Sequence, residues 1–273
     1  MLISFLTLVG FGCLTGVTTV FFGFGGGFVT VPVVYGVLTV AARPAAGGAD
    51  AMHVAVATSA AVMAVNASAA ALAQWRADRL RTEYVWPLAG YIALGAAAGS
   101  LAATLVGGTV LRLLFAAYLL VTIADSLLRK GFLAAVARER PRPLGRSTVT
   151  FGGVGIGLVA AGLGVGGSVM TVPLLRRRGL PMAEATATAN PLSVPVALTG
   201  TLVYALAPAV TAAGGAGRLG YVDPAAGAAL LAGSLPVIAL LRRTAGRVPD
   251  RVHSAAYVGL LLVVLVVMTA TGA

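Results

Sequence analysis

Charged residues are scarce in this sequence. Only 10% of its 273 residues are Asp, Glu, Lys or Arg, 59% are hydrophobic, and the mean hydropathy is +0.96. A soluble domain of this size needs a more polar surface, so the composition excludes a soluble protein and indicates a polytopic membrane protein. Charge-free windows recur at 2–42, 54–73, 85–111, 147–175, 185–217, 224–241 and 254–273. Several exceed the ~20 residues that cross a bilayer. The first nine residues lack the basic segment of a signal peptide and are interpreted as membrane segment.

Residue types that carry catalysis or bind metals are also few. The chain has two histidines and one cysteine, and it contains no H-E-x-x-H or G-x-S-x-G motif. We therefore expect no enzyme activity, no metal and no cofactor. Cys13 has no second cysteine to pair with, and its apolar neighbours favour a packing role. The net charge of +11 is explained by arginines in membrane loops, so we expect no nucleic-acid partner.

Glycine, by contrast, is abundant, and two glycine-rich runs repeat. The run "GFGGGFVTVP" at 23–32 agrees with "GVGGSVMTVP" at 164–173 in six of ten positions. "GSL" at 99–101 recurs at 233–235, and "AAY" at 116–118 recurs at 255–257, in the same order. This order predicts two membrane repeats, residues 1–128 and 147–273, joined by a basic cytoplasmic linker at 129–146.

The positive charges predict how the repeats are oriented. Lys and Arg collect in cytoplasmic loops, so the linker, with six of them, lies inside. With five membrane elements per repeat, sixteen of the nineteen Lys and Arg fall inside, and only Arg43, Arg112 and Arg218 fall outside with both termini. If each glycine region crossed the membrane only once, the arginine clusters at 176–178 and 242–251 would both lie outside. We therefore expect an all-α integral membrane protein of the cell membrane, built from two inverted repeats of five elements.

The glycine runs break apolar segments where a membrane helix would otherwise continue. In the second repeat, residues 147–161 and 168–175 span roughly 22 and 12 Å as helices, less than the ~30 Å hydrocarbon core. We expect a re-entrant hairpin that turns at 162–167, and a counterpart whose first arm, residues 2–22, is long enough to cross fully. Because irregular backbone at this depth must be covered by protein or water, the two turns are expected to meet inside the molecule.

Amide N–H groups at a helix start form an anion site. The predicted backbone contribution comes from Gly23, Gly25, Gly26, Gly27, Gly164, Gly166 and Gly167. The Thr-Val-Pro that follows each run is typical of a helix start, with proline in the first turns. Other glycines, namely Gly95, Gly99, Gly153 and Gly157, are expected to serve close helix packing.

Polar side chains follow in the next helix of each repeat. Pro191 and Pro195 are expected to unwind the second of these helices locally. The predicted neutral donors to an anion are Thr30, Thr58, Ser59, Ser168, Thr171, Thr188 and Asn190. His53 and Glu184 stand near the starts of these helices, where an interfacial position and a proton relay are both open.

The two "GxGGxxxTVP" runs, the "AVATS" at 55–59 and the duplicated plan resemble the TauE/SafE family, also called the 4-toluene sulfonate uptake permease family (TSUP). The resemblance covers essentially the whole chain. It implies transport of sulfite, sulfonates or other small organic anions, outward or inward, across a prokaryotic cytoplasmic membrane. The matching positions are the glycine runs with Thr58 and Ser59. The second half departs from the pattern, with "TATANP" at 186–191 where a second Thr-Ser would be expected.

The sequence therefore favours a secondary transporter (permease or exporter) for a small anion, with a passive anion channel as the alternative. The expected partners are the anionic substrate and membrane lipid, and a homo-oligomer is possible. Neither the coupling ion nor the direction of transport follows from the residues.

Overall fold

The computed structural model describes residues 2–41, 48–78, 80–128, 142–207, 217–241 and 248–270, and within these ranges it contains helices and turns but no strand. The first half forms α1 (Leu2–Phe22), α2 (Gly27–Ala41), α3 (Gly48–Arg76), α4 (Thr82–Thr104) and α5 (Gly108–Leu128). The second half begins with a π-helical turn, η1 (Thr148–Gly152), that continues into α6 (Gly153–Gly162). It goes on with α7 (Ser168–Arg177), α8 (Met182–Leu206), α9 (Pro224–Leu241) and α10 (Asp250–Ala270).

Seven of the described helices, α1, α3, α4, α5, α8, α9 and α10, are long and apolar enough to cross a membrane. The expected all-helical membrane class is thereby confirmed. The other four described elements, α2, η1, α6 and α7, are shorter. α2 has 15 residues and α7 has 10, so they span roughly 22 and 15 Å. A hydrocarbon core is ~30 Å thick, so neither helix crosses it alone.

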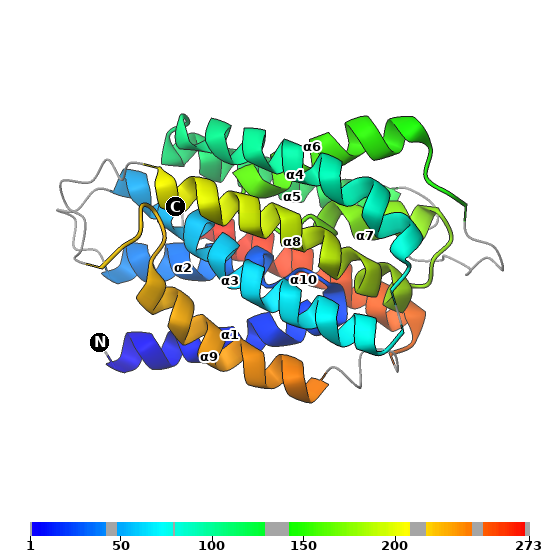
Figure 1. Ribbon diagram of the computed structural model, residues 1–273. Coiled ribbons are helices and arrows are strands. Elements are labelled where there is room, and N and C mark those ends of the chain that lie inside the picture. The colour runs from blue at the N-terminus through cyan, green and yellow to red at the C-terminus, as the bar shows by residue number, and fades with distance from the viewer. Residues whose placement is uncertain are drawn as a thin grey trace.

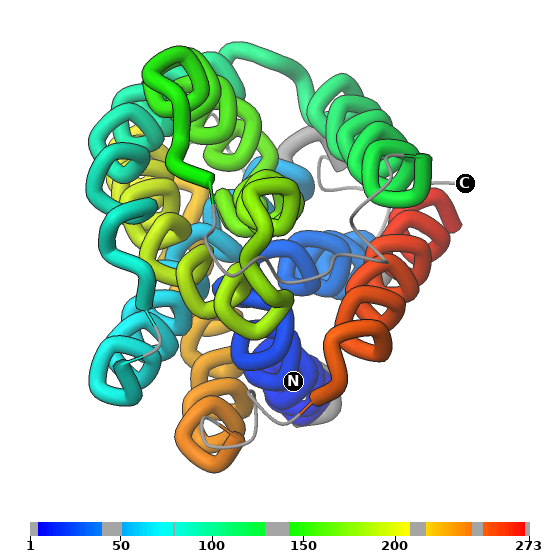
Figure 2. Tube along the Cα trace, turned by 90° about the vertical axis from the view of Figure 1, so that its right-hand side faces the viewer, coloured from blue at the N-terminus to red at the C-terminus, as the bar shows by residue number. Residues whose placement is uncertain are grey.

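The helices pair between the two halves of the chain. α1 packs along α9, α4 along α6, and α3 along α8, and α5 contacts α10 (Figure 2). α1 begins and α10 ends at the left of Figure 1, so both chain ends lie at one end of the bundle. α3 and α8 pack together in the middle of the bundle. The glycine turns between α1 and α2 and between α6 and α7 lie against these two helices.

Glycine allows two of these pairs to approach backbone to backbone. A Cβ atom added at Gly95 would lie 2.0 Å from Val154 O, and one at Gly157 would lie 2.0 Å from Ile92 O. In the same α4–α6 contact, a Cβ at Gly99 would lie 2.0 Å from Leu158 O, and one at Gly153 would lie 2.8 Å from Tyr91 Cβ. The predicted packing role of these four glycines is confirmed. α1 and α9 use the same device, since a Cβ at Gly12 would lie 2.2 Å from Leu230 O.

Two local expectations about proline are wrong. α8 continues through Pro191 and Pro195, because each proline removes one N–H while the rest of the ladder and the buried face of the helix hold its shape. Pro173 is the sixth residue of α7, beyond the first turn, so it leaves Val169 O without the usual helical donor. The hydroxyl of Tyr257 donates to that carbonyl at 2.9 Å instead. Pro32 has the same position in α2.

A third expectation is also wrong, because Cys13 is exposed on α1. Packing at that point is done by the neighbouring Gly12, whose missing side chain admits α9.

Arginines gather at one end of the bundle, the right-hand end in Figure 1. Arg43, Arg79, Arg242, Arg243 and Arg247, and the linker residues 129–141, lie outside the described residues. Eight described arginines lie at that end, on the helix ends or connections that meet there: Arg76, Arg81, Arg142, Arg146, Arg176, Arg177, Arg178 and Arg251. Two, Arg112 and Arg218, lie toward the opposite end.

Candidate functional site: the two glycine turns

The break in each half is a short glycine turn between two helices. Residues 23–26 connect α1 to α2, and residues 163–167 connect α6 to α7. Gly26 has a φ of 90° and Gly164 a φ of 66°, a left-handed backbone that side chains rarely adopt. Space is equally limiting, since a Cβ at Gly26 would lie 2.4 Å from Thr15 Cγ2. Glycine is therefore required at both positions by conformation as well as by packing.

The two turns lie against each other, although 141 positions separate their sequences. A Cβ at Gly27 would lie 2.7 Å from Gly164 O, and one at Gly166 would lie 2.6 Å from Phe24 O. Ser59 of α3 joins them, because its hydroxyl donates to Gly164 O at 2.6 Å and lies 3.3 Å from Gly27 O. All these residues are buried. The two halves thus bring their helix breaks to one enclosed place.

Three of the predicted side chains, Thr30, Thr58 and Thr188, already have a hydrogen-bond partner in the fold. The Thr30 hydroxyl donates to Gly26 O at 2.8 Å. The Thr58 hydroxyl accepts from the amide of Asp223, just before α9, at 3.0 Å, and the Thr188 hydroxyl accepts from the amide of Arg81, just before α4, at 3.4 Å. Thr58 and Thr188 therefore have equivalent roles, each holding the start of a helix from the other half.

Three other predicted residues carry polar atoms with no use in the described structure. Ser168 Oγ, Thr171 Oγ1 and both amide atoms of Asn190 are buried and have no hydrogen-bond partner among the described residues. All three residues are fully buried. On α8, Thr186 lies against Gly23 and Ser193 lies against Gly166. Asn190 lies four residues after Thr186 and three residues before Ser193, so it shares the face of α8 that meets both turns.

The backbone amides at the two helix starts differ. In α2, Thr30 N bonds to Gly26 O, while Gly27, Phe28 and Val29 have no amide partner among the described residues. In α7 the corresponding amides are bonded within the protein. Ser168 N donates to Ser193 Oγ at 3.3 Å. The amides of the next three residues, Val169 to Thr171, donate to Gly166 O or Gly167 O. The free amides that we expected at both helix starts are therefore found at α2, whereas α7 instead has free hydroxyls.

The arginine-rich end is held by three ion pairs between helices. Arg81 pairs with Glu184 at 3.0 Å, Arg177 pairs with Asp125, and Arg176 pairs with Asp250 at 2.8 Å. The bond to Glu184 and its charge raise the pKa of the Arg81 guanidinium. Glu184, expected near an interface, thus serves an ion pair that is largely exposed.

Arg176 is the residue that sequence reasoning missed. It was expected as one of a loop triplet, yet it is buried and also bonds Ser254 Oγ at 3.2 Å. Its burial depends on the ion pair with Asp250, which is 74 positions away and is not indicated by the local sequence.

His53, the other candidate for proton coupling, lies near the opposite end of the bundle. It is buried, its Nε2 lies 2.9 Å from Val106 O and 3.2 Å from Ala103 O, and its ring stacks on Tyr221. Its position beside a helix end fits both of the roles that the sequence left open. Among the described residues, no group of three or more His, Cys, Asp or Glu side chains is placed to hold a metal ion.

A bundle with seven described helices able to cross a membrane, and with polar atoms buried at two touching helix breaks, indicates a multi-pass membrane protein. The sequence model of the sulfite exporter TauE/SafE family matches residues 8–268. The chain belongs to this family, whose members are membrane transporters for sulfite. Neither the curated proteins nor the solved structures contain a match to it.

Proposed function

We propose that the protein is a secondary transporter that carries small sulfur-containing or organic anions, such as sulfite or short sulfonates, across the cell membrane. The observation that supports this most is the set of unpartnered buried donors at the two glycine turns. A buried polar group without a partner costs roughly 1–3 kcal/mol. A site that keeps several of them gains free energy when a ligand accepts their hydrogen bonds.

The chemistry of these donors suits an anion. The free amides at the start of α2 carry the positive end of a helix dipole, and hydroxyls and a carboxamide stand nearby. We assign substrate binding to the free amides at the start of α2, with Ser168, Thr171 and Asn190 as the side-chain donors. Hydrogen bonds to a charged acceptor contribute about 1.5–3 kcal/mol each. The described arginines lie toward the ends of the bundle, so recognition rests on charge and size rather than on a bidentate arginine.

The helix pairing supports the inverted repeat. In two repeats, residues 1–128 and 147–273 joined by the linker 129–146, α1 corresponds to α6 and α4 corresponds to α9. The pairs α1–α9 and α4–α6 are then equivalent, and α3–α8 and α5–α10 pair counterparts. The equivalent roles of Thr58 and Thr188 agree with the same relation. The short α2, α6 and α7 fit hairpins that turn within the membrane.

The charge distribution supports a cytoplasmic position for the arginine-rich end. In that orientation both termini lie outside. Single cysteines introduced at Arg251 or Arg146 of intact cells would then escape an impermeant thiol reagent, whereas one at Arg218 would react. If the cysteines at positions 251 and 146 reacted and the one at position 218 did not, the opposite orientation would be correct.

Uptake and efflux by the purified protein in proteoliposomes tests the function. We expect saturable movement of labelled sulfite or a short sulfonate, with a rate that responds to an imposed proton or sodium gradient. A rate that rises linearly with concentration would favour a passive channel instead. Faster movement of phosphate than of every sulfur oxyanion would refute the substrate class. Loss of proton dependence in His53→Gln or Glu184→Gln would identify the coupling group.

A further inference from the structure

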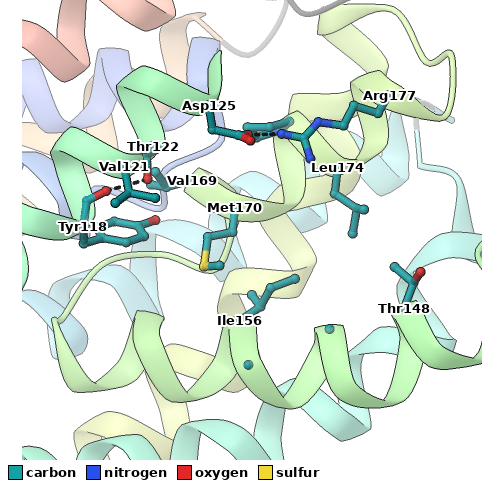
Figure 3. Close-up of a pocket in the computed structure, with 13 residues that line it drawn as sticks. Tyr118, Val121, Thr122, Asp125, Thr148, Ile156, Val169, Met170, Leu174 and Arg177 are labelled. Carbon is teal, nitrogen blue, oxygen red and sulfur yellow. Dashed lines mark hydrogen bonds and ion pairs between the residues drawn. The ribbon is translucent and has the colours of Figure 1, made fainter. Parts of the chain in front are cut away.

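A pocket of about 420 Å³ opens between α5, the η1–α6 segment and α7 (Figure 3). Its wall is mostly apolar, with Val121, Ile156, Met170 and Leu174 facing the space. Asp125 and Arg177 line it at the arginine-rich end of the bundle. The pocket therefore runs from the charged helix ends into the apolar part of the protein.

The mouth of the pocket is spanned by an ion pair. Arg177 Nη2 donates to Asp125 Oδ2, which connects the end of α7 to the end of α5. The two side chains are 35% and 26% exposed, so water and solutes reach them. An anion that arrives here competes with the Asp125 carboxylate for the guanidinium of Arg177, since both offer oxygen acceptors of the same charge sign.

The inner end of the pocket lies beside the second glycine turn. Val169 and Met170, in the first turn of α7, line it. Ile156 also lines it, and its Cγ2 lies 3.6 Å from the Cβ position of Gly167. Ile156 therefore contacts both the pocket and Gly167, the residue just before α7. The buried hydroxyl of Tyr118 also lines the pocket.

We infer that this pocket is the vestibule through which the anion reaches the glycine turns from the arginine-rich end, with Arg177 and Asp125 as its gate. The inference rests on the proposed anion transport. Arg177 attracts the anion and excludes cations, and Asp125 holds the gate closed when no anion is present. The apolar wall offers few hydrogen bonds, so the anion does not stay there but passes on to the donors at the turns, as conduction requires.

A glycine in the wall provides a direct test. A Cβ at Gly155 would meet nothing within 4 Å, so the side chain of Gly155→Leu has room to begin there and would extend into the pocket that Gly155 lines. Gly90, an exposed helical glycine of α4 that also has open space, gives the matched control Gly90→Leu. We expect sulfite transport to fall at least tenfold in Gly155→Leu and to stay unchanged in Gly90→Leu, with the same thermal unfolding midpoint in both. Wild-type transport by a folded Gly155→Leu protein would overturn the inference.

Thiol labelling tests the gate independently of transport. In a Cys13→Ala background, Met170→Cys would react with a negatively charged methanethiosulfonate from the arginine-rich side faster than with a positively charged one. Steering by a local charge changes such rates by roughly tenfold. Asp125→Asn should raise the rate with the anionic reagent, Arg177→Gln should lower it, and the control Arg251→Gln should leave it unchanged.

The outcomes separate the two proposals. The vestibule is refuted if the labelling rate depends neither on the charge of the reagent nor on either gate variant, in a protein that still transports sulfite. The proposed function would then remain intact. Charge-selective labelling that sulfite slows supports the vestibule. If the labelling follows the gate variants but no sulfur oxyanion slows it or is transported, the substrate class is wrong while the anion pathway stands.

Discussion

Replacement of Asn190 by leucine tests the site most sharply, because it is expected to change binding and stability in opposite directions. Leucine has the same branched outline as asparagine, with methyl groups in place of the amide oxygen and nitrogen, and it carries no polar atom. In the ligand-free protein both amide atoms of Asn190 are buried without partners. Each such atom costs roughly 1–3 kcal/mol. Asn190→Leu removes that cost, so the unfolding midpoint of the ligand-free protein should stay the same or rise.

Anion binding should weaken in the same variant. One charge-assisted hydrogen bond contributes about 1.5–3 kcal/mol. At 1.4 kcal/mol per factor of ten, this loss corresponds to roughly a 10- to 150-fold increase in Kd for the anion. Binding of sulfite to the purified protein by calorimetry gives the Kd, and thermal unfolding in detergent gives the midpoint.

A matched pair of threonines controls for general effects of removing a polar group. The Thr171 hydroxyl has no partner, whereas the Thr186 hydroxyl, also buried, donates to Met182 O at 2.9 Å. Thr171→Val should therefore weaken binding without loss of stability, and Thr186→Val should leave binding unchanged. If Asn190→Leu unfolds at a lower temperature and binds sulfite with the wild-type Kd, its amide is structural and the site lies elsewhere.

Three further predictions concern the contact between the turns and its surroundings. Ser59→Ala leaves Gly164 O buried without its donor and should lower the free energy of unfolding by about 1–3 kcal/mol in detergent; an unchanged midpoint would mean that the hydroxyl adds nothing. Gly27→Ala places a Cβ 2.7 Å from Gly164 O and should yield little monodisperse protein by size-exclusion chromatography, since backbone must move. Tyr257→Phe removes the hydroxyl that donates to Val169 O and should cost about 1–3 kcal/mol on thermal unfolding, which wild-type stability would contradict.

Much of the architecture was predictable because it depends on local composition. Apolar segments of about 20 residues must become helices in lipid, where every backbone group needs a partner. The glycine runs predicted the two breaks. The recurrence of "GSL" and "AAY" predicts that α4 corresponds to α9 and α5 to α10, which stays a prediction. The packing role of Gly95 and Gly99 followed from their spacing alone.

The site was predictable only in part. The polar residues near the breaks were identified, but the sequence does not say which hydroxyls are satisfied by a distant partner. Thr58 bonds an amide 165 positions away, and Thr188 bonds one 107 positions away. The buried Arg176 was hidden for the same reason, since its partner Asp250 belongs to another helix.

The sequence by itself determined that this chain is a helical membrane protein of the TauE/SafE family with a break in each half, because hydropathy and glycine act within a few neighbouring residues. Tertiary structure decided what the breaks contain. The Thr30 hydroxyl bonds locally to Gly26 O, whereas tertiary packing gives partners to Ser59, Thr58 and Thr188 and leaves Ser168, Thr171 and Asn190 with buried, unused hydrogen-bonding groups. Whether a polar atom is free depends on groups brought from distant parts of the chain, and only the folded arrangement of the helices decides that.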